Sequence, residues 1–134
     1  MSLSHVNPSA LHTNPAFSQG VRIDGGTLLV VGGQNGTDAA GDIVSDDLGE
    51  QTVQAFRNVL AVLADAGADQ RHVAKLSIYL QAGGDVSAGY QAAAAVWGQH
   101  PTAITVLQVA GLARPDALVE IDALAVLPEE EMET

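Results

Sequence analysis

Two carboxylates stand close together near the end of the chain, where Glu120 and Asp122 alternate with apolar residues. Such alternation places both side chains on the same face of a β-strand, one pleat apart. Glu120 could act as a general base towards a bound molecule, or it could be an interface carboxylate satisfied by a neighbouring backbone or by water. We interpret Asp122 as structural.

Other kinds of chemistry find little support in the sequence. The four histidines, at 5, 12, 72 and 100, lack the paired spacing of a zinc site, so no metal is predicted. Neither a nucleophile elbow nor the order of a Ser-His-Asp triad is present. The chain has no cysteine for disulfides or thiolate catalysis. We therefore expect neither a metal nor another cofactor.

The segment Gly32-Gly33-Gln34-Asn35-Gly36 is rich in glycine, as phosphate-binding loops are. No helix opens directly after it and no lysine occupies the phosphate-loop position, so a nucleotide site is not predicted there. We interpret the segment as a turn, or as a strand end that lets a ligand or another backbone approach closely.

The elements that position these residues follow from hydrophobic spacing. Short apolar runs at 21–23 and 27–31 flank Asp24-Gly25-Gly26 and predict a β-hairpin. Apolar residues at helical spacing predict a helix over 47–66, with Asp47 and Glu50 at its start and Gly67 at its end. A second helix is predicted over 86–97, with an alanine-rich face packed closely on the sheet.

Three further segments, 73–80, 104–109 and 118–127, are predicted to be strands. The resulting order ββαβαββ predicts an α+β domain in which two helices cover one face of a mixed sheet. Odd positions of the last strand are expected to face the helices. The opposite face is half apolar and half acidic, and such a face usually finds a cover in another subunit. We therefore infer a homo-oligomer.

Length and charge restrict the class of protein. The 134 residues, 47% of them hydrophobic, predict one domain over 16–127, preceded by a flexible segment, 1–15, and followed by an acidic tail, 128–134. The net charge of -11 disfavours nucleic acid and anionic lipid as partners. Neither a membrane span nor the pattern of a signal peptide is found, so we expect a soluble, cytoplasmic protein.

Five short segments carry a family resemblance: Phe17-Ser18-Gln19, Val31-Gly32-Gly33-Gln34, Glu50-Gln51-Thr52, His100-Pro101 and Val119-Glu120-Ile121-Asp122-Ala123. In their order and spacing, residues 16–126 resemble the Rid family, the reactive intermediate deaminases of the YjgF type. The resemblance implies a chorismate-mutase-like trimer with ligand clefts between its subunits.

At three positions the sequence differs from the pattern of the family that it resembles. Family members that hydrolyse enamines and imines released by pyridoxal-phosphate enzymes hold the substrate carboxylate with an arginine after the second helix. That place here is Ile104, in Pro101-Thr102-Ala103-Ile104, and isoleucine supplies no charged, bidentate contact. Phe17 replaces the family's usual tyrosine, and Tyr90 replaces a small polar residue. The resemblance therefore implies a more apolar and aromatic cleft.

Glu120 matches the family's carboxylate, which positions the attacking water, and Gly33 and the strand at Thr105 match backbone elements of the cleft. We predict a homotrimer that binds a small neutral or aromatic metabolite in a cleft lined by Phe17, Gly33, Tyr90, Ile104 and Thr105. Glu120 would assist hydrolysis of an imine-like or enamine-like group, and 2-aminoacrylate is not the expected substrate.

The sequence is compatible with two classes of protein. The chain could be such a hydrolase or deaminase, or a non-catalytic ligand-binding or scaffold protein of the same fold. Ribonuclease activity, attributed to some relatives, fits the charge least well. Arg114, or Arg22 of a neighbouring subunit, could replace the missing guanidinium, although the position of Arg114 next to Pro115 equally suits a solvated side chain.

Overall fold

The computed structural model describes residues 2–128, so the glutamates of the predicted acidic tail lie outside the described residues. Its elements in chain order are β1 (Leu3–Val6), β2 (Gly20–Ile23), β3 (Thr27–Gln34), α1 (Leu48–Asp65), the short 3-10 helix η1 (Gln70–His72), β4 (Val73–Gln81), α2 (Val86–Trp97), β5 (Ala103–Val109) and β6 (Val119–Leu127).

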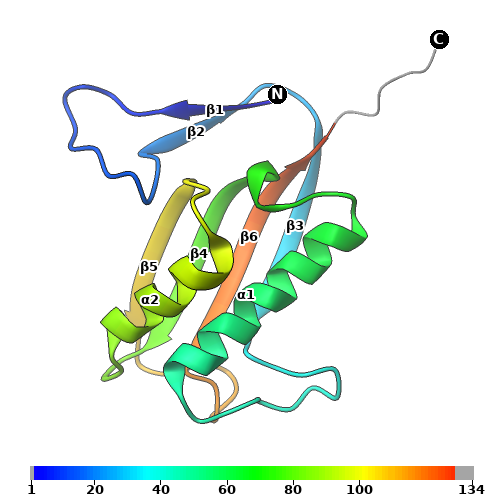
Figure 1. The fold of residues 1–134 in the computed structure, drawn as a ribbon, viewed down its shortest axis with the longest axis vertical. Coiled ribbons are helices and arrows are strands. Elements are labelled where there is room, and N and C mark those ends of the chain that lie inside the picture. Colours follow the sequence, from blue (N-terminus) through cyan, green and yellow to red (C-terminus); the bar gives the residue numbers. More distant parts are fainter. Residues whose placement is uncertain (1, 129–134) are drawn as a thin grey trace.

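The main sheet has four strands in the order β3-β6-β4-β5. Strands β4 and β5 are parallel, whereas β6 is antiparallel to both of its neighbours, β3 and β4. Helices α1 and α2 lie side by side on one face of this sheet (Figure 1). The predicted α+β architecture, with two helices covering one face of a mixed sheet, is therefore confirmed.

The predicted hairpin between the first two apolar runs is wrong in its pairing. Strand β2 pairs with β1 in a separate two-stranded sheet, and β3 pairs with β6. Gly25 and Gly26 have φ values of 85° and 99°, so the connection turns the chain from one sheet into the other. Strand β1 was not predicted, because four residues are too few to establish an alternating pattern.

Both helices begin and end within one residue of their predicted bounds. The side chain of Asp47 caps α1 by accepting a hydrogen bond from the backbone N–H of Glu50, at 2.9 Å. Asp85 caps α2 in the same way, through the N–H groups of Ser87 and Ala88. Gly67 and Gly98, which follow the two helices, both have a φ of 77°.

The residues of strand β6 alternate between the two faces of the sheet. The predicted helix-facing residues Val119, Ile121, Ala123 and Ala125 are buried in the core together with Phe56, Val59 and Leu63 of α1. The other side, which we call the open face, carries the alternate residues of each strand. Val126 lies on the open face but is buried, because it packs against Gly26 of the turn before β3.

Asp69 caps η1 and forms an ion pair with Arg71, with 2.8 Å between Oδ2 and Nη2. The side-chain hydrogen bond from Arg71 is the main cause that lowers the pKa of Asp69 from 3.8 to about 2. Since the folded pKa lies below the unfolded one, the pair stabilises the fold above about pH 4, and this stabilisation is lost as the pH falls towards 2.

We expect Asp69→Asn to lower the free energy of unfolding at pH 6 by less than about 1 kcal/mol, because surface ion pairs are screened by water. The two side chains are 41% and 62% exposed. At pH 2 the variant and the parent should differ less than at pH 6. Urea unfolding at both pH values measures this, with Asp46→Asn as the control. A larger difference at pH 2 than at pH 6 would contradict the assignment.

Candidate functional site

The predicted site residues lie on both sides of the sheet. Ile104 is in register with Leu76 of β4, which in turn pairs with Ala123, and these side chains face the helices. Glu120 pairs with Tyr79 on the open face. Within one chain, the sheet therefore separates Ile104 from Glu120.

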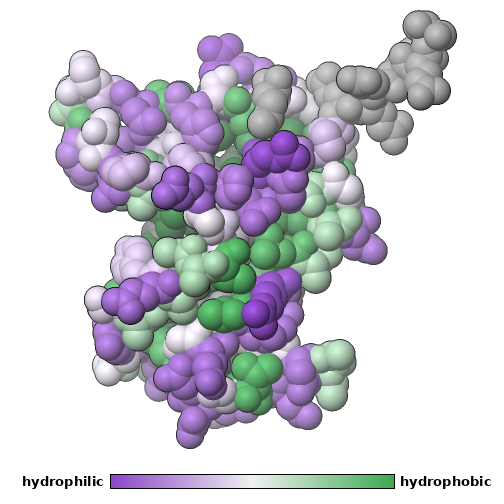
Figure 2. Space-filling model, in the orientation of Figure 1, coloured by the Kyte–Doolittle hydropathy of each residue, from purple (hydrophilic) through white to green (hydrophobic). Residues whose placement is uncertain are grey.

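A cavity of about 350 Å³, which we call the helix-side cavity, lies between α2 and the sheet. Figure 2 shows hydrophobic residues gathered on this side of the molecule, below the N-terminal segment. None of the residues that line the cavity is a lysine, an arginine or a carboxylate. They are Pro15, Ala16, Phe56, Leu76, Ile78, Tyr90, Ala93, Ala94, Trp97, Gly98, Gln99, His100, Ile104 and Val106.

The alanine face of α2 was expected to pack closely on the sheet, and around the cavity it does not. Ala93 and Ala94 line the cavity, because their single methyl groups are too short to fill the space above Ile104 and Val106 of β5. The apolar stretch of α2 thus leaves the space above β5 open. The buried residues of α2 are Gly89, in its first turn, and Trp97, its last residue.

Trp97 is the chain's single tryptophan and is held firmly beside the cavity. Its ring is 5.3 Å from that of Phe56, centre to centre, and its Nε1 donates to the carbonyl of His100 at 3.2 Å. Its own carbonyl accepts a hydrogen bond from Gln70 at 3.4 Å. Sequence reasoning did not identify Trp97 or His100 as site residues, since a tryptophan at a helix end is typical of a core position.

The N-terminal segment closes one side of the cavity with Pro15 and Ala16. It is attached to the start of β5, because Ser18 donates its N–H to the carbonyl of Thr102 at 3.0 Å. Phe17 does not line the cavity and instead packs edge to face against His12, with 6.2 Å between the ring centres.

On the open face, Glu120 lies over a β-bulge. Val31 pairs with Ala123 and Gln34 with Ile121, so β3 contains one extra residue between these pairs. A Cβ placed on Gly33 would come within 2.9 Å of the Glu120 Cδ. The glycine therefore makes room for the carboxyl group.

Two further groups on the open face have partners of their own. Asp122 accepts a hydrogen bond from the hydroxyl of Tyr79 at 3.3 Å. Thr105 receives a hydrogen bond from the amino group of Lys75 through its Oγ1. The structure thus gathers Gly33 with Glu120 on the open face and Tyr90 with Ile104 at the helix-side cavity, and it places Thr105 on the open face of β5.

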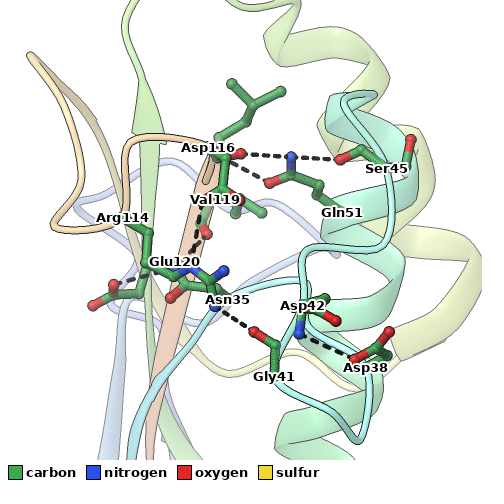
Figure 3. Close-up of polar contacts among 11 residues, drawn as sticks. Asn35, Asp38, Gly41, Asp42, Ser45, Gln51, Arg114, Asp116, Val119 and Glu120 are labelled. Carbon is green, nitrogen blue, oxygen red and sulfur yellow. Dashed lines mark hydrogen bonds and ion pairs between the residues drawn. The ribbon is translucent and has the colours of Figure 1, made fainter.

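Arg114 and Arg22, the two candidates to replace the family's arginine, have other partners. Arg114 lies in the loop between β5 and β6, where its Nη1 donates to the carbonyl of Gly41 at 2.6 Å and its Nε to Asp116 at 3.3 Å (Figure 3). Arg22 pairs with Asp24 at 2.8 Å on the surface. Neither arginine lines the helix-side cavity of this chain.

Residues 2–128 contain neither a candidate metal site nor a candidate membrane-spanning helix. Within this range, His, Asp and Glu side chains form no group of three or more that could hold a metal ion. The helices in the same range lack the length and apolar character that a membrane span requires.

The chain matches a family model and is similar to known proteins. The family model described as endoribonuclease L-PSP matches residues 7–127. A RutC family protein of Pyrococcus abyssi is 31% identical over 110 residues, covering 81% of this chain and 84% of the relative. Protein DfrA of Myxococcus xanthus is 33% identical over 124 residues, covering 87% of this chain and 94% of the relative.

Solved structures of proteins from the same family have a similar fold. The Rid family protein YyfB of Yersinia pestis matches with a TM-score of 0.85 and 32% identity, covering 95% of this chain and all of that one. RidA of an Antarctic Psychrobacter matches with a TM-score of 0.69 and 25% identity, covering 90% and 94%.

The sheet order and the paired helices define an α+β protein of the chorismate-mutase-like class. Within that class, the family model and the relatives settle the family. The chain belongs to the Rid (YjgF) family, the family whose model is described as endoribonuclease L-PSP.

Proposed function

We propose that the protein is a homotrimer whose intersubunit clefts bind a small neutral or aromatic molecule and hydrolyse an imine-like group in it. The observation that carries this proposal is the helix-side cavity, which has Ile104 in the place of the family's arginine and a lining without lysine or arginine. A substrate carboxylate buried there would lack a charged partner, which costs several kcal/mol.

The assembly is supported by the open face of the sheet. Leu28, Val30 and Leu107 lie on this face and are 56%, 74% and 49% exposed. Apolar side chains of this size are stabilised when a second copy covers them. A cleft that contains both Ile104 and Glu120 also needs two subunits, because the sheet separates these residues within one.

The proposed chemistry is the addition of water to a carbon-nitrogen double bond. Glu120 of one subunit accepts a proton from water while the water oxygen bonds to the imine carbon, and Glu120 then gives this proton to the imine nitrogen. Collapse of this adduct breaks the carbon-nitrogen bond and releases a carbonyl compound and an amine. The cavity of the neighbouring subunit, with Tyr90 and Ile104, holds the apolar part of the substrate.

Trp97 provides a direct test of ligand preference, because it is the only tryptophan and it lines the cavity. Benzyl alcohol should change its fluorescence saturably, whereas benzoate, of similar size but charged, should not. Ile104→Arg should bind benzoate at least about tenfold more tightly than the parent. Ile104→Val, the matched control, should keep the parent's preference. Preferential binding of benzoate by the parent would refute the neutral-ligand proposal.

Turnover is tested with two substrates. N-benzylidenemethylamine, a neutral aromatic imine, should be hydrolysed faster than its background rate, and Glu120→Gln should lower kcat at least about a hundredfold. Ammonia release from 2-aminoacrylate should stay far below that of an arginine-bearing family member. Turnover of 2-aminoacrylate at that member's rate would overturn the substrate assignment.

The alternative is a non-catalytic ligand-binding or scaffold protein, and one observation favours it. The carboxylate of Glu120 accepts a hydrogen bond from Asn35 and lies on the open face, away from the cavity of the same subunit. For such a binder, Glu120→Gln should leave benzyl alcohol affinity unchanged and no imine should be turned over. Ribonuclease activity is disfavoured because a net charge of -11 repels a phosphate backbone.

A further inference from the structure

The carboxylate of Glu120 is held by Asn35, a residue from the loop after β3. The Nδ2 of Asn35 lies 3.3 Å from the Glu120 Oε1 and donates to it (Figure 3). The same amide group donates to the carbonyl of Val119 at 3.0 Å. The amide group of Asn35 therefore binds both the backbone of β6 and the carboxylate of Glu120.

The orientation of the Asn35 amide is fixed by these contacts. Both neighbours, a carbonyl and a carboxylate, are acceptors, so the nitrogen rather than the oxygen of the amide must face them. Oε1 of Glu120 is thereby occupied. Oε2 lies over Gly33, where a Cβ would collide with it.

The loop that carries Asn35 is itself attached to α1. Asn58 donates to the backbone carbonyl of Asn35 at 3.1 Å and to that of Thr37 at 3.0 Å. Gln54, one helical turn earlier, donates to the Asn58 Oδ1 at 2.9 Å. A continuous series of hydrogen bonds thus connects the helix layer to a carboxylate on the opposite side of the sheet.

From this geometry we infer that Asn35 is a positioning residue for Glu120: it holds Oε1 and leaves Oε2, over the Gly33 bulge, to accept the proton of the attacking water. The inference rests on the proposed function of Glu120 as general base. Without Asn35, the carboxylate can rotate freely about its last torsion, which has no strong preferred angle of its own. A misplaced base reduces turnover without weakening the binding of the substrate.

The contact itself is tested without any substrate, by a double-mutant cycle. Asn35→Asp keeps the shape of the side chain but sets two carboxylates against each other, and Glu120→Gln removes the charge from the acceptor. In the double variant, the glutamine at position 120 can donate to the aspartate at position 35. A hydrogen bond therefore forms again, with donor and acceptor exchanged. We expect a coupling of about tenfold in the unfolding equilibrium constant. Urea unfolding at one fixed protein concentration measures it.

The positioning role is tested by turnover of N-benzylidenemethylamine. Asn35→Leu should lower kcat about ten- to a hundredfold, while KM and the Trp97-reported affinity for benzyl alcohol stay within about twofold. Gln54→Leu is the matched control, because it loses an amide in the same series of bonds without touching Glu120. Its kcat should stay within about twofold of the parent.

The outcomes separate this inference from the proposed function. Additive effects in the cycle, or a kcat unchanged by Asn35→Leu, overturn the positioning role. Equal losses of kcat in Asn35→Leu and Gln54→Leu overturn it too, because they indicate general loosening of the loop. If the parent hydrolyses no imine, the proposed function fails on that result, and the positioning role fails with it even where the cycle shows coupling.

Discussion

Gly36→Ala is expected to destabilise the fold by about 2–3 kcal/mol, the cost of forcing an extra methyl group into a packed site. Gly36 is buried, and a Cβ at this position would lie 2.5 Å from the carbonyl oxygen and 2.7 Å from the Cα of Gln51. These are backbone atoms in the first turn of α1, so they cannot move aside without shifting the helix. The loop after β3 owes its close approach to α1 to this glycine.

The measurement is urea unfolding at a fixed protein concentration, with Gly111→Ala as the control. A Cβ at Gly111 would meet no atom within 4 Å, and this glycine does not have a positive φ. Its replacement should therefore change the free energy of unfolding by no more than about 0.5 kcal/mol, or raise it slightly. Equal unfolding midpoints for the two variants would show that the loop accommodates a side chain at Gly36.

Gln51→Leu is expected to cost about 3 kcal/mol, because a fully buried amide is lost together with its three hydrogen bonds. The side chain of Gln51 donates to the carbonyls of Ser45 and Asp116, at 2.8 and 3.1 Å, and accepts from the N–H of Leu118 at 2.8 Å. It thereby joins the loop before α1 to the loop before β6 (Figure 3). Leucine has a similar size but leaves these backbone groups without a partner.

Gln91→Leu makes the same chemical change on the exposed surface of α2 and should alter stability by less than about 0.5 kcal/mol. Unfolding by urea compares the two variants, and hydrogen exchange at the amide of Leu118 should accelerate in Gln51→Leu alone. A loss of stability in Gln51→Leu no larger than in Gln91→Leu would mean that water replaces the buried amide without cost.

The helices and the main strands were predictable because their signals are local. The stripe containing Phe56 and Leu63 and the caps at Asp47 and Asp85 lie within a few residues of the elements that they define. The pairing of β2 with β1 was not predictable in the same way. It depends on residues separated by more than a dozen positions and on the path of the turn at Gly25 and Gly26.

The candidate site was predicted only in part, for a related reason. Sequence comparison with the family grouped Ile104 with Glu120, but the direction of a side chain depends on strand register, which the sequence of β5 alone does not specify. The role of Asn35 could not be found from spacing, since it is 85 residues from Glu120 along the chain. Its contact exists because the bulge in β3 and the attachment of the loop to Asn58 bring the two side chains together.

The sheet that keeps the helix-side cavity apart from Glu120 within one subunit also makes the two regions separable in protein engineering. Residues that line the cavity, such as Ile104 and Tyr90, share no hydrogen bond with Asn35 or Glu120. Under the proposed function, a library that varies the cavity therefore changes which molecule is accepted while the carboxylate and its support remain intact. Selectivity and reactivity can be optimised in independent rounds of mutation and then combined.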